Sequence, residues 1–131
     1  MTHKRLPLED YREWLNRARS NLVQARAVMP GVYFEDLCFE AQQAAEKAIK
    51  AVFVYRAESF PYTHNISRLL KQLERDGIRV PKYVYRAVGL SRFAVETRYP
   101  GLSGPVSNRQ YQSAVRIAAA VLQWAERQTK G

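Results

Sequence analysis

The apolar side chains of this chain recur at alternating spacings of three and four residues, and this pattern constrains the fold more than any other feature. In the segment 8–28 the stripe consists of Leu8, Tyr11, Leu15, Ala18, Leu22, Ala25 and Met29. Such a stripe is typical of an amphipathic α-helix. No segment alternates apolar and polar residues as a half-buried strand does, so the sequence predicts an all-α protein.

Two further long segments, 34–57 and 108–128, show the same helical periodicity. The stripe of the segment 34–57 consists of Cys38, Ala41, Ala45, Ala48, Val52 and Tyr55. The stripe of the segment 108–128 consists of Tyr111, Ala114, Val115, Ala118, Val121, Leu122 and Ala125. Alanine on these faces lets a neighbouring helix approach closely. Ser107 or Asn108 is the expected N-cap of the last helix.

Two shorter helices are predicted over 64–75 and 81–98. The apolar side of the first consists of Ile66, Leu69, Leu70 and Leu73, and that of the second of Val84, Ala87, Val88, Ser91 and Val95. Thr63 is a suitable N-cap for the first of these helices. Pro81 suits the first turn of the second, which must end near Arg98 because Pro100 disfavours the α conformation at the preceding residue.

Glycine and proline stand at the boundaries of these segments, and the connections are short. About five helices with short connections predict an antiparallel up-and-down helical bundle, with residues 1–131 forming a single domain. The longest loop, 99–108, contains two glycines and two prolines. Since functional residues are often carried by loops on a rigid scaffold, this segment is the best candidate for a functional loop.

Composition excludes several classes of protein. Hydrophobic residues make up 47% of the chain, too many for a disordered protein. The single cysteine, Cys38, allows no intrachain disulfide, and with only two histidines we expect neither a structural zinc site nor a cofactor. The N-terminus lacks the apolar core of a signal peptide, and the longest apolar run, 117–122, is far shorter than the ~20 residues of a membrane span. We therefore expect a cytoplasmic protein.

The chain is basic, with 21 lysines and arginines against 12 acidic residues and a formal net charge of +9. Such a charge attracts nucleotides, nucleic acid or an acidic protein, although solubility alone explains it equally well. A group of arginines lies in and around the last two predicted helices: Arg86, Arg92, Arg98, Arg109 and Arg116. If these helices pair antiparallel, the group could form one basic patch. A scattered, solvated surface is the alternative.

Four short strings occur in a characteristic order over residues 8–125. They are CFEAQQAAEKAIKA at 38–51, THNI at 63–66 followed by Leu69-Leu70, ETRYPG at 96–101, and Tyr111 followed by alternating alanine and valine. In type, order and spacing these strings resemble the HEPN family. The resemblance implies a helical bundle that commonly pairs as a homodimer and has a nucleotide-binding role. Many prokaryotic members work beside a separate minimal nucleotidyltransferase, often as toxin–antitoxin-like pairs.

One large branch of the family consists of metal-independent ribonucleases. Its signature is an arginine that stabilises charge on the phosphate, followed after four to six residues by a histidine that transfers a proton. Arg98 stands near the position of that arginine, but no histidine follows it, and His3 and His64 are the only histidines of the chain. The sequence therefore argues against an enzyme, and we expect no catalytic residue of this kind.

The resemblance and the charge suggest a nucleotide-binding site formed by Arg98, Tyr99, Glu46, Lys47 and His64. Arg98 could bind phosphate, or simply favour the dipole at the end of its helix. Tyr99 could stack on a base or pack within the protein. Glu46 and Lys47 could line a groove near Arg98, or form a solvated face. For His64, a capping or hydrogen-bonding role at the start of a helix is favoured over catalysis.

The sequence also suggests roles for several other side chains. Cys38 is expected to be a small core residue. Trp14 and Trp124, on the first and last long helices, could anchor a dimer interface, where aromatic residues are enriched, or could pack in the core. Glu46 and Lys50 are four residues apart in the order that favours an ion pair.

The leading hypothesis from the sequence is a non-catalytic HEPN module. It homodimerises, binds a nucleotide or polyanion near Arg98 and assists a nucleotidyltransferase partner. One alternative is a divergent metal-independent ribonuclease that uses Arg98 with Tyr99 or His64. The other is a protein-interaction scaffold whose basic face binds an acidic protein and which has no nucleotide site.

Overall fold

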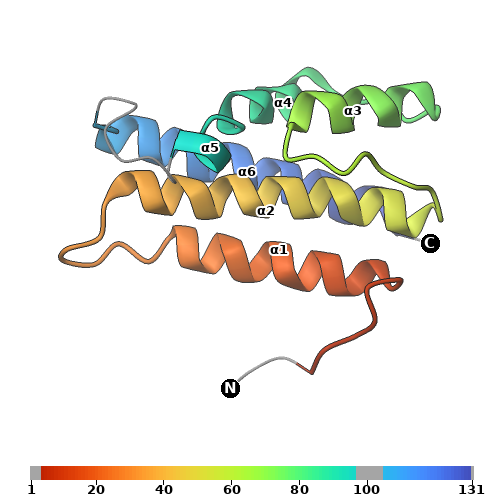
Figure 1. Cartoon of the computed structure of the whole chain (residues 1–131), viewed down its shortest axis with the longest axis horizontal. Coiled ribbons are helices and arrows are strands. Elements are labelled where there is room, and N and C mark those ends of the chain that lie inside the picture. Colours follow the sequence, from red (N-terminus) through yellow and green to blue (C-terminus); the bar gives the residue numbers. More distant parts are fainter. Residues whose placement is uncertain (1–3, 97–104, 131) are drawn as a thin grey trace.

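A computed structural model describes residues 4–96 and 105–130 of the chain as an all-helical bundle (Figure 1). The elements are α1 (Tyr11–Ala25), α2 (Phe34–Tyr55), α3 (Ile66–Arg75), α4 (Lys82–Tyr85), a 3₁₀ helix η1 (Arg86–Leu90), α5 (Phe93–Glu96) and α6 (Asn108–Gln128). The described ranges contain no strand. The predicted all-α helical bundle is confirmed.

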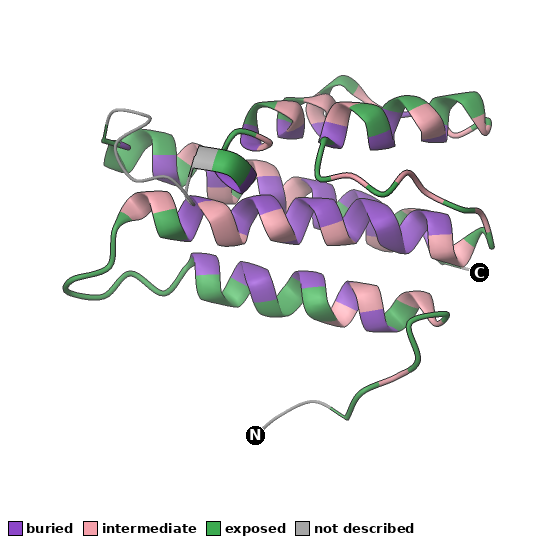
Figure 2. Cartoon of the chain, in the orientation of Figure 1, coloured by how far each residue is buried: buried purple, intermediate pink, exposed green. Residues whose placement is uncertain are grey.

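Helix α2 forms the centre of the bundle. It packs against α1 on one side and α6 on another, while α3 and the short helices cover the remaining side (Figure 1). Its buried side chains run along almost its whole length (Figure 2). Five alanines of α2 have no exposed surface, namely Ala41, Ala44, Ala45, Ala48 and Ala51. Small side chains on several sides of one helix allow three neighbours to pack closely around it.

The described N-caps explain where the helices begin. Asp10 caps α1, so this helix starts three residues later than the apolar pattern predicts, and Leu8 stays exposed. Asn65 caps α3 by accepting a hydrogen bond from the Arg68 amide. The prediction of Thr63 as this cap is wrong, because the Thr63 hydroxyl accepts a hydrogen bond from the Asn65 amide instead.

Helix α6 begins with a capping box. The Ser107 hydroxyl accepts from the Gln110 amide, and the Gln110 side chain accepts from the Ser107 amide. This reciprocal pair satisfies two amides that have no partner within the helix. Of the two caps expected from the sequence, Ser107 is therefore the one that the structure uses.

The predicted helix over 81–98 is the main difference from the sequence interpretation. The chain forms α4, η1 and α5 in succession, and the buried residues Val84, Ala87, Leu90 and Phe93 are three positions apart. A 3₁₀ helix has three residues per turn, so residues three apart all lie on one side of it. In a straight α-helix, with 3.6 residues per turn, the later residues of this series would rotate away from the core. Val95, assigned to the inner face from the sequence, is exposed.

The two tryptophans have different environments. Trp124 is buried in the core, so the described chain offers it to no external interface. Trp14 is half-buried, packs edge-on against Phe60 and donates from Nε1 to the Leu8 carbonyl at 2.8 Å. Cys38 is fully buried, as expected of a small core residue, and burial raises the pKa of its thiol to about 11. No helix in the described ranges is long and apolar enough to cross a membrane.

Candidate functional site

A strip of polar side chains lies buried on α2. From the sequence, a solvated face was one alternative for this part of the helix. Gln42, Glu46 and Lys50 are 0%, 3% and 8% exposed. Gln42 Nε2 donates to Glu46 Oε1 at 2.9 Å, and Lys50 Nζ donates to Glu46 Oε2 at 2.8 Å. Successive members are one helical turn apart, so their side chains meet along one side of the helix. The predicted Glu46–Lys50 pair is confirmed, but it is buried.

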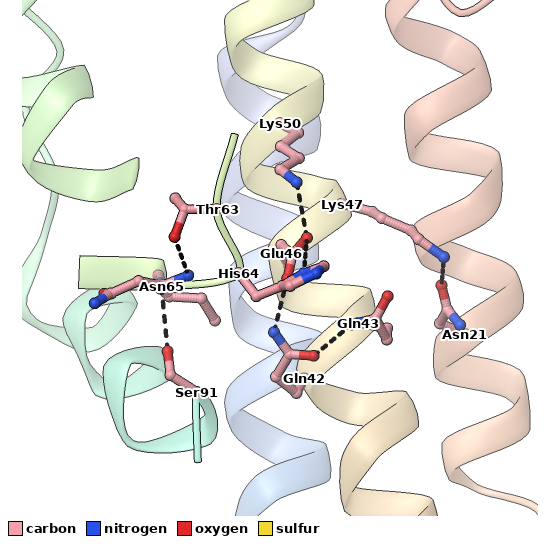
Figure 3. A network of polar contacts seen from close by, with 11 residues as sticks. Asn21, Gln42, Gln43, Glu46, Lys47, Lys50, Thr63, His64, Asn65 and Ser91 are labelled. Atoms are coloured by element: carbon pink, nitrogen blue, oxygen red, sulfur yellow. Dashed lines mark hydrogen bonds and ion pairs between the residues drawn. The ribbon is translucent and has the colours of Figure 1, made fainter. Parts of the chain in front are cut away.

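His64 joins this strip from the connection between α2 and α3 (Figure 3). Its Nδ1 lies 3.0 Å from Glu46 Oε1 and 3.1 Å from Glu46 Oε2, while its side chain remains 57% exposed. An ionised carboxylate only accepts hydrogen bonds, so Nδ1 carries the proton and donates it. The expected hydrogen-bonding role of His64 is thereby confirmed. Gln42, Glu46, Lys50 and His64 are called the Glu46 network below.

The charge state of Glu46 follows from its partners. Burial alone would raise the pKa of this carboxyl, but the hydrogen bonds from Lys50, Gln42 and His64 together outweigh burial and lower the pKa. Glu46 is therefore ionised at neutral pH and accepts donors from three side chains. A carboxylate occupied in this way positions His64 and holds Lys50, and it has little capacity left for a ligand.

Lys47 points to the other side of α2, towards α1 (Figure 3). Its Nζ donates to Asn21 Oδ1 at 2.8 Å, and Asn21 Nδ2 in turn donates to Glu40 Oε1 at 2.7 Å. Burial is the main cause that lowers the pKa of Lys47, followed by the nearby Arg17 charge. The structure therefore brings Glu46 and His64 together and separates Lys47 from them.

Arg98 and Tyr99 lie outside the residues that the structure describes. Their assignment to a nucleotide site stays a prediction. Sequence reasoning identified Glu46, Lys50 and His64 but missed Gln42, which completes the network. The spacing of four residues between Gln42 and Glu46 was the available signal, because such pairs interact on a helix.

Arginines converge on a second region, a surface groove of about 370 Å³ between η1 and α5 on one side and α6 on the other. This groove, called the η1–α6 groove below, is lined by Arg86, Gly89, Leu90, Arg92, Phe93, Arg109, Gln110, Ser113, Ala114 and Ile117. Three of the five arginines grouped in the sequence thus border one site. Arg116 does not, because it lies on another side of α6 with Arg26.

The electrostatics of the η1–α6 groove are one-sided. Its charged lining residues are all arginines, and no carboxylate belongs to the described lining. Within the described chain, Arg86 and Arg109 have no ion-pair partner, while Arg92 lies over the Phe93 ring at 4.5 Å from its centroid. Arg109 stands in the first turn of α6, where a cation opposes the helix dipole. Arg109 therefore contributes positive charge to the groove without stabilising its own helix.

Comparison with known proteins is consistent with this architecture. The family model of the HEPN domain matches residues 11–128. The chain belongs to the HEPN family. The crystal structure of TT1696 from Thermus thermophilus is similar, with 30% identity, a TM-score of 0.78 and coverage of 92% of this chain and 99% of TT1696.

A second solved structure supports the same assignment. ST0689, described as an archaeal HEPN homologue, is 27% identical to this chain with a TM-score of 0.73, and the match covers 98% of this chain and 100% of ST0689. Among curated proteins, none matches. The resemblance drawn from the four sequence strings is therefore confirmed at the level of the family.

Proposed function

We propose that this protein is a non-catalytic HEPN module that binds a nucleotide or polyanion in the η1–α6 groove. The single observation that carries the proposal is the convergence of Arg86, Arg92 and Arg109 on one groove whose described lining holds no carboxylate. As further parts of the proposal, the module pairs as a homodimer and assists a minimal nucleotidyltransferase partner. These two parts rest on the family resemblance.

The chemistry of the groove suits a phosphate group attached to a flat ring. Guanidinium groups bind phosphate oxygens through paired, charge-assisted hydrogen bonds. Leu90, Phe93 and Ile117 add an apolar lining against which a base can rest. The groove is open to solvent, so it suits a nucleotide or polyanion that lies along the surface rather than one enclosed in a pocket.

The sequence supports a non-catalytic role. The family's ribonuclease signature needs a histidine shortly after Arg98, and none follows. The histidine among the site candidates, His64, precedes Arg98 in the sequence and so does not match that signature.

The test is a thermal-shift titration of nucleic-acid-free protein. The ligands are the common nucleoside triphosphates and a short oligouridylate, applied to the wild type, Arg109→Ala and Arg98→Ala. Arg68→Ala on α3 is the matched control, because Arg68 is exposed and lies outside the groove lining. A ligand at one hundred times its dissociation constant stabilises the fold by ~2.7 kcal/mol, which raises Tm by several degrees.

Each outcome has a definite meaning. A shift that Arg109→Ala reduces and Arg68→Ala keeps supports the η1–α6 groove as the binding site. Loss of the shift in Arg98→Ala alone would place the site at Arg98 instead. If no nucleotide and no oligouridylate shifts Tm, the proposed binding function is wrong.

A divergent metal-independent ribonuclease is the second candidate, favoured by one observation. The buried Glu46 carboxylate holds the imidazole of the half-exposed His64 through Nδ1, and a carboxylate that orients a histidine is a common arrangement for proton transfer. RNA cleavage in the presence of a chelator, abolished by His64→Gln and by Arg98→Ala, would establish this activity. Chelator-resistant cleavage that both variants retain would instead indicate a contaminating nuclease.

A further inference from the structure

A second groove lies on the opposite flank of α6, between this helix and the end of α1. It has a volume of about 670 Å³ and is called the α1–α6 groove. Helix α6 contributes Tyr111, Gln112, Val115, Arg116, Ala119, Ala120 and Gln123. Consecutive positions in this set are one or three residues apart, so they form one continuous side of the helix. This side adjoins the core side of α6, which includes Ala114, Ala118 and Val121, at the buried Tyr111.

The middle of this side is small and apolar. Val115, Ala119 and Ala120 are all half-buried rather than covered, and no described element packs over them. Two alanines in adjacent positions leave room for the backbone of another helix to approach, since helix axes pack about 8–10 Å apart according to the side chains between them.

The α1 side of the groove continues into exposed apolar surface. Val28 lines the groove and is 58% exposed, and Met29 beside it is 59% exposed. Val23, one turn before Arg26 on α1, is 68% exposed. Large exposed apolar side chains next to an apolar groove mark a surface that binds another protein.

Charge restricts what can occupy this surface. Arg26 lies on the α1 side and Arg116 on the α6 side, and no carboxylate belongs to the described lining. Neither arginine has an ion-pair partner within the described chain. Farther along the same two helices, Arg19 of α1 forms an ion pair with Glu126 of α6 at 2.7 Å. An arginine is therefore neutralised where α1 and α6 contact each other, whereas the described lining of the groove contains no carboxylate that could do the same.

A second copy of the chain satisfies this charge poorly. In a twofold-symmetric dimer with this groove on its axis, the two grooves face each other, so four arginines would gather without a described lining carboxylate between them. Like charges brought together at an interface are unfavourable. The occupant must therefore supply the negative charge itself.

We infer that the α1–α6 groove is a docking site for an amphipathic helix of a partner protein that carries carboxylates beside an apolar stripe. The apolar stripe packs on Val115, Ala119 and Ala120, and the carboxylates pair with Arg26 and Arg116 on the two sides. Helices commonly bind grooves through apolar residues at spacings of three and four. This inference does not depend on nucleotide binding, which is proposed for the other flank of α6.

The test uses two synthetic, fluorescein-labelled helical peptides of about 20 residues, long enough to be helical with a stabilising staple. Both carry one leucine and alanine stripe, flanked by glutamates in one peptide and by lysines in the other. We expect the wild-type protein to bind the glutamate peptide, measured by fluorescence anisotropy. The double variant Arg26→Glu/Arg116→Glu should lose about tenfold or more in affinity for it and should gain affinity for the lysine peptide.

Controls separate the alternatives. Arg68→Glu on α3 makes half of this charge change outside the groove and should leave binding unchanged. Val115→Asn should weaken binding of the glutamate peptide to the wild type and of the lysine peptide to the double variant, because it removes apolar contact without adding charge. Circular dichroism of each variant checks that it is folded.

Three results would overturn the inference. The first is equal affinity of the wild type for the two peptides. The second is an equal loss of affinity for the glutamate peptide in Arg68→Glu and in Arg26→Glu/Arg116→Glu, because binding would then depend on the overall charge of the protein and not on this groove. The third is a wild-type dimer in sedimentation that Val115→Asn converts to monomer, because a second copy would then occupy the groove.

Discussion

The Glu46 network and the η1–α6 groove both consist of charged side chains, but they differ in what satisfies the charge. In the network, Glu46 accepts hydrogen bonds from Gln42, Lys50 and His64, and the first two donors are buried with it. In the groove, three exposed arginines border a surface without a described carboxylate. Charge that is paired inside the molecule fixes the fold, whereas the exposed charges of Arg86 and Arg109, which have no ion-pair partner within the described chain, are available to a ligand.

The comparison also shows why charge in a sequence is ambiguous. Glu46 and Lys47 are neighbours, yet one is buried against His64 and the other binds Asn21 on α1. Adjacent helix positions differ by about 100° in direction, so neighbours in sequence meet different surroundings. A cluster of charges in sequence therefore becomes a site only where the tertiary structure brings the side chains together.

The largest effect is expected for Glu46→Ala, which removes the centre of the network. Lys50 and Gln42 would be left buried without their acceptor, and breaking a buried ion pair in this way costs about 3–5 kcal/mol. Urea unfolding followed by circular dichroism measures the free energy of unfolding. Glu9→Ala, at an exposed carboxylate, is the matched control and should change stability by less than about 0.5 kcal/mol. Similar losses in both variants would contradict the role given to the network.

The pH dependence of stability tests the same carboxylate with a smaller effect, because a protonated Glu46 still fills its place. Its pKa in the folded protein lies below the ordinary value of 4.5. The ionised carboxylate therefore contributes stability above pH 4.5, and this contribution is lost as the pH falls through the folded pKa. Urea titrations between about pH 3 and 6 should show a smaller loss in Glu46→Gln than in the wild type. Parallel curves for the two proteins would show that Glu46 is not the group responsible.

Arg109→Ala should separate binding from stability. Removing one charge-assisted contact should reduce the affinity for oligouridylate by about tenfold, which corresponds to ~1.4 kcal/mol. The free energy of unfolding should stay the same or rise by a few tenths of a kcal/mol, because a cation at the start of α6 opposes the helix dipole. Anisotropy titrations and urea unfolding measure the two quantities. A loss of stability without a loss of affinity would mean that Arg109 stabilises the fold and does not bind the ligand.

The smallest effect is expected for His64→Ala. His64 is more than half exposed, and an exposed ion pair contributes at most about 1 kcal/mol. Urea unfolding should show a loss of this size, and His64→Asn should recover part of it, because the asparagine amide can donate to Glu46 in place of Nδ1. A loss as large as that of Glu46→Ala would mean that His64 is an essential part of the core.

The sequence predicted the long helices well for a physical reason. In α1, α2 and α6 the apolar stripe follows the helical period over many turns, and Ser107 was one of the two caps expected for α6. The prediction of one continuous helix over 81–98 was wrong because the buried residues of this segment are three apart. In a short sequence this spacing fits an α-helix as well as a 3₁₀ helix. Only packing against α2 and α6 makes the 3₁₀ turn preferable there.

By itself, the sequence determined the all-α class, the positions of the long helices, the family and the Glu46–Lys50 pair, because each depends on residues close together along one helix or on a characteristic string. The tertiary structure decided the burial of Glu46, its contact with His64, the separation of Lys47 and the division of the arginines between two flanks of α6. These features join residues from different helices. Their geometry depends on how the helices pack and rotate against one another, which local spacing does not specify.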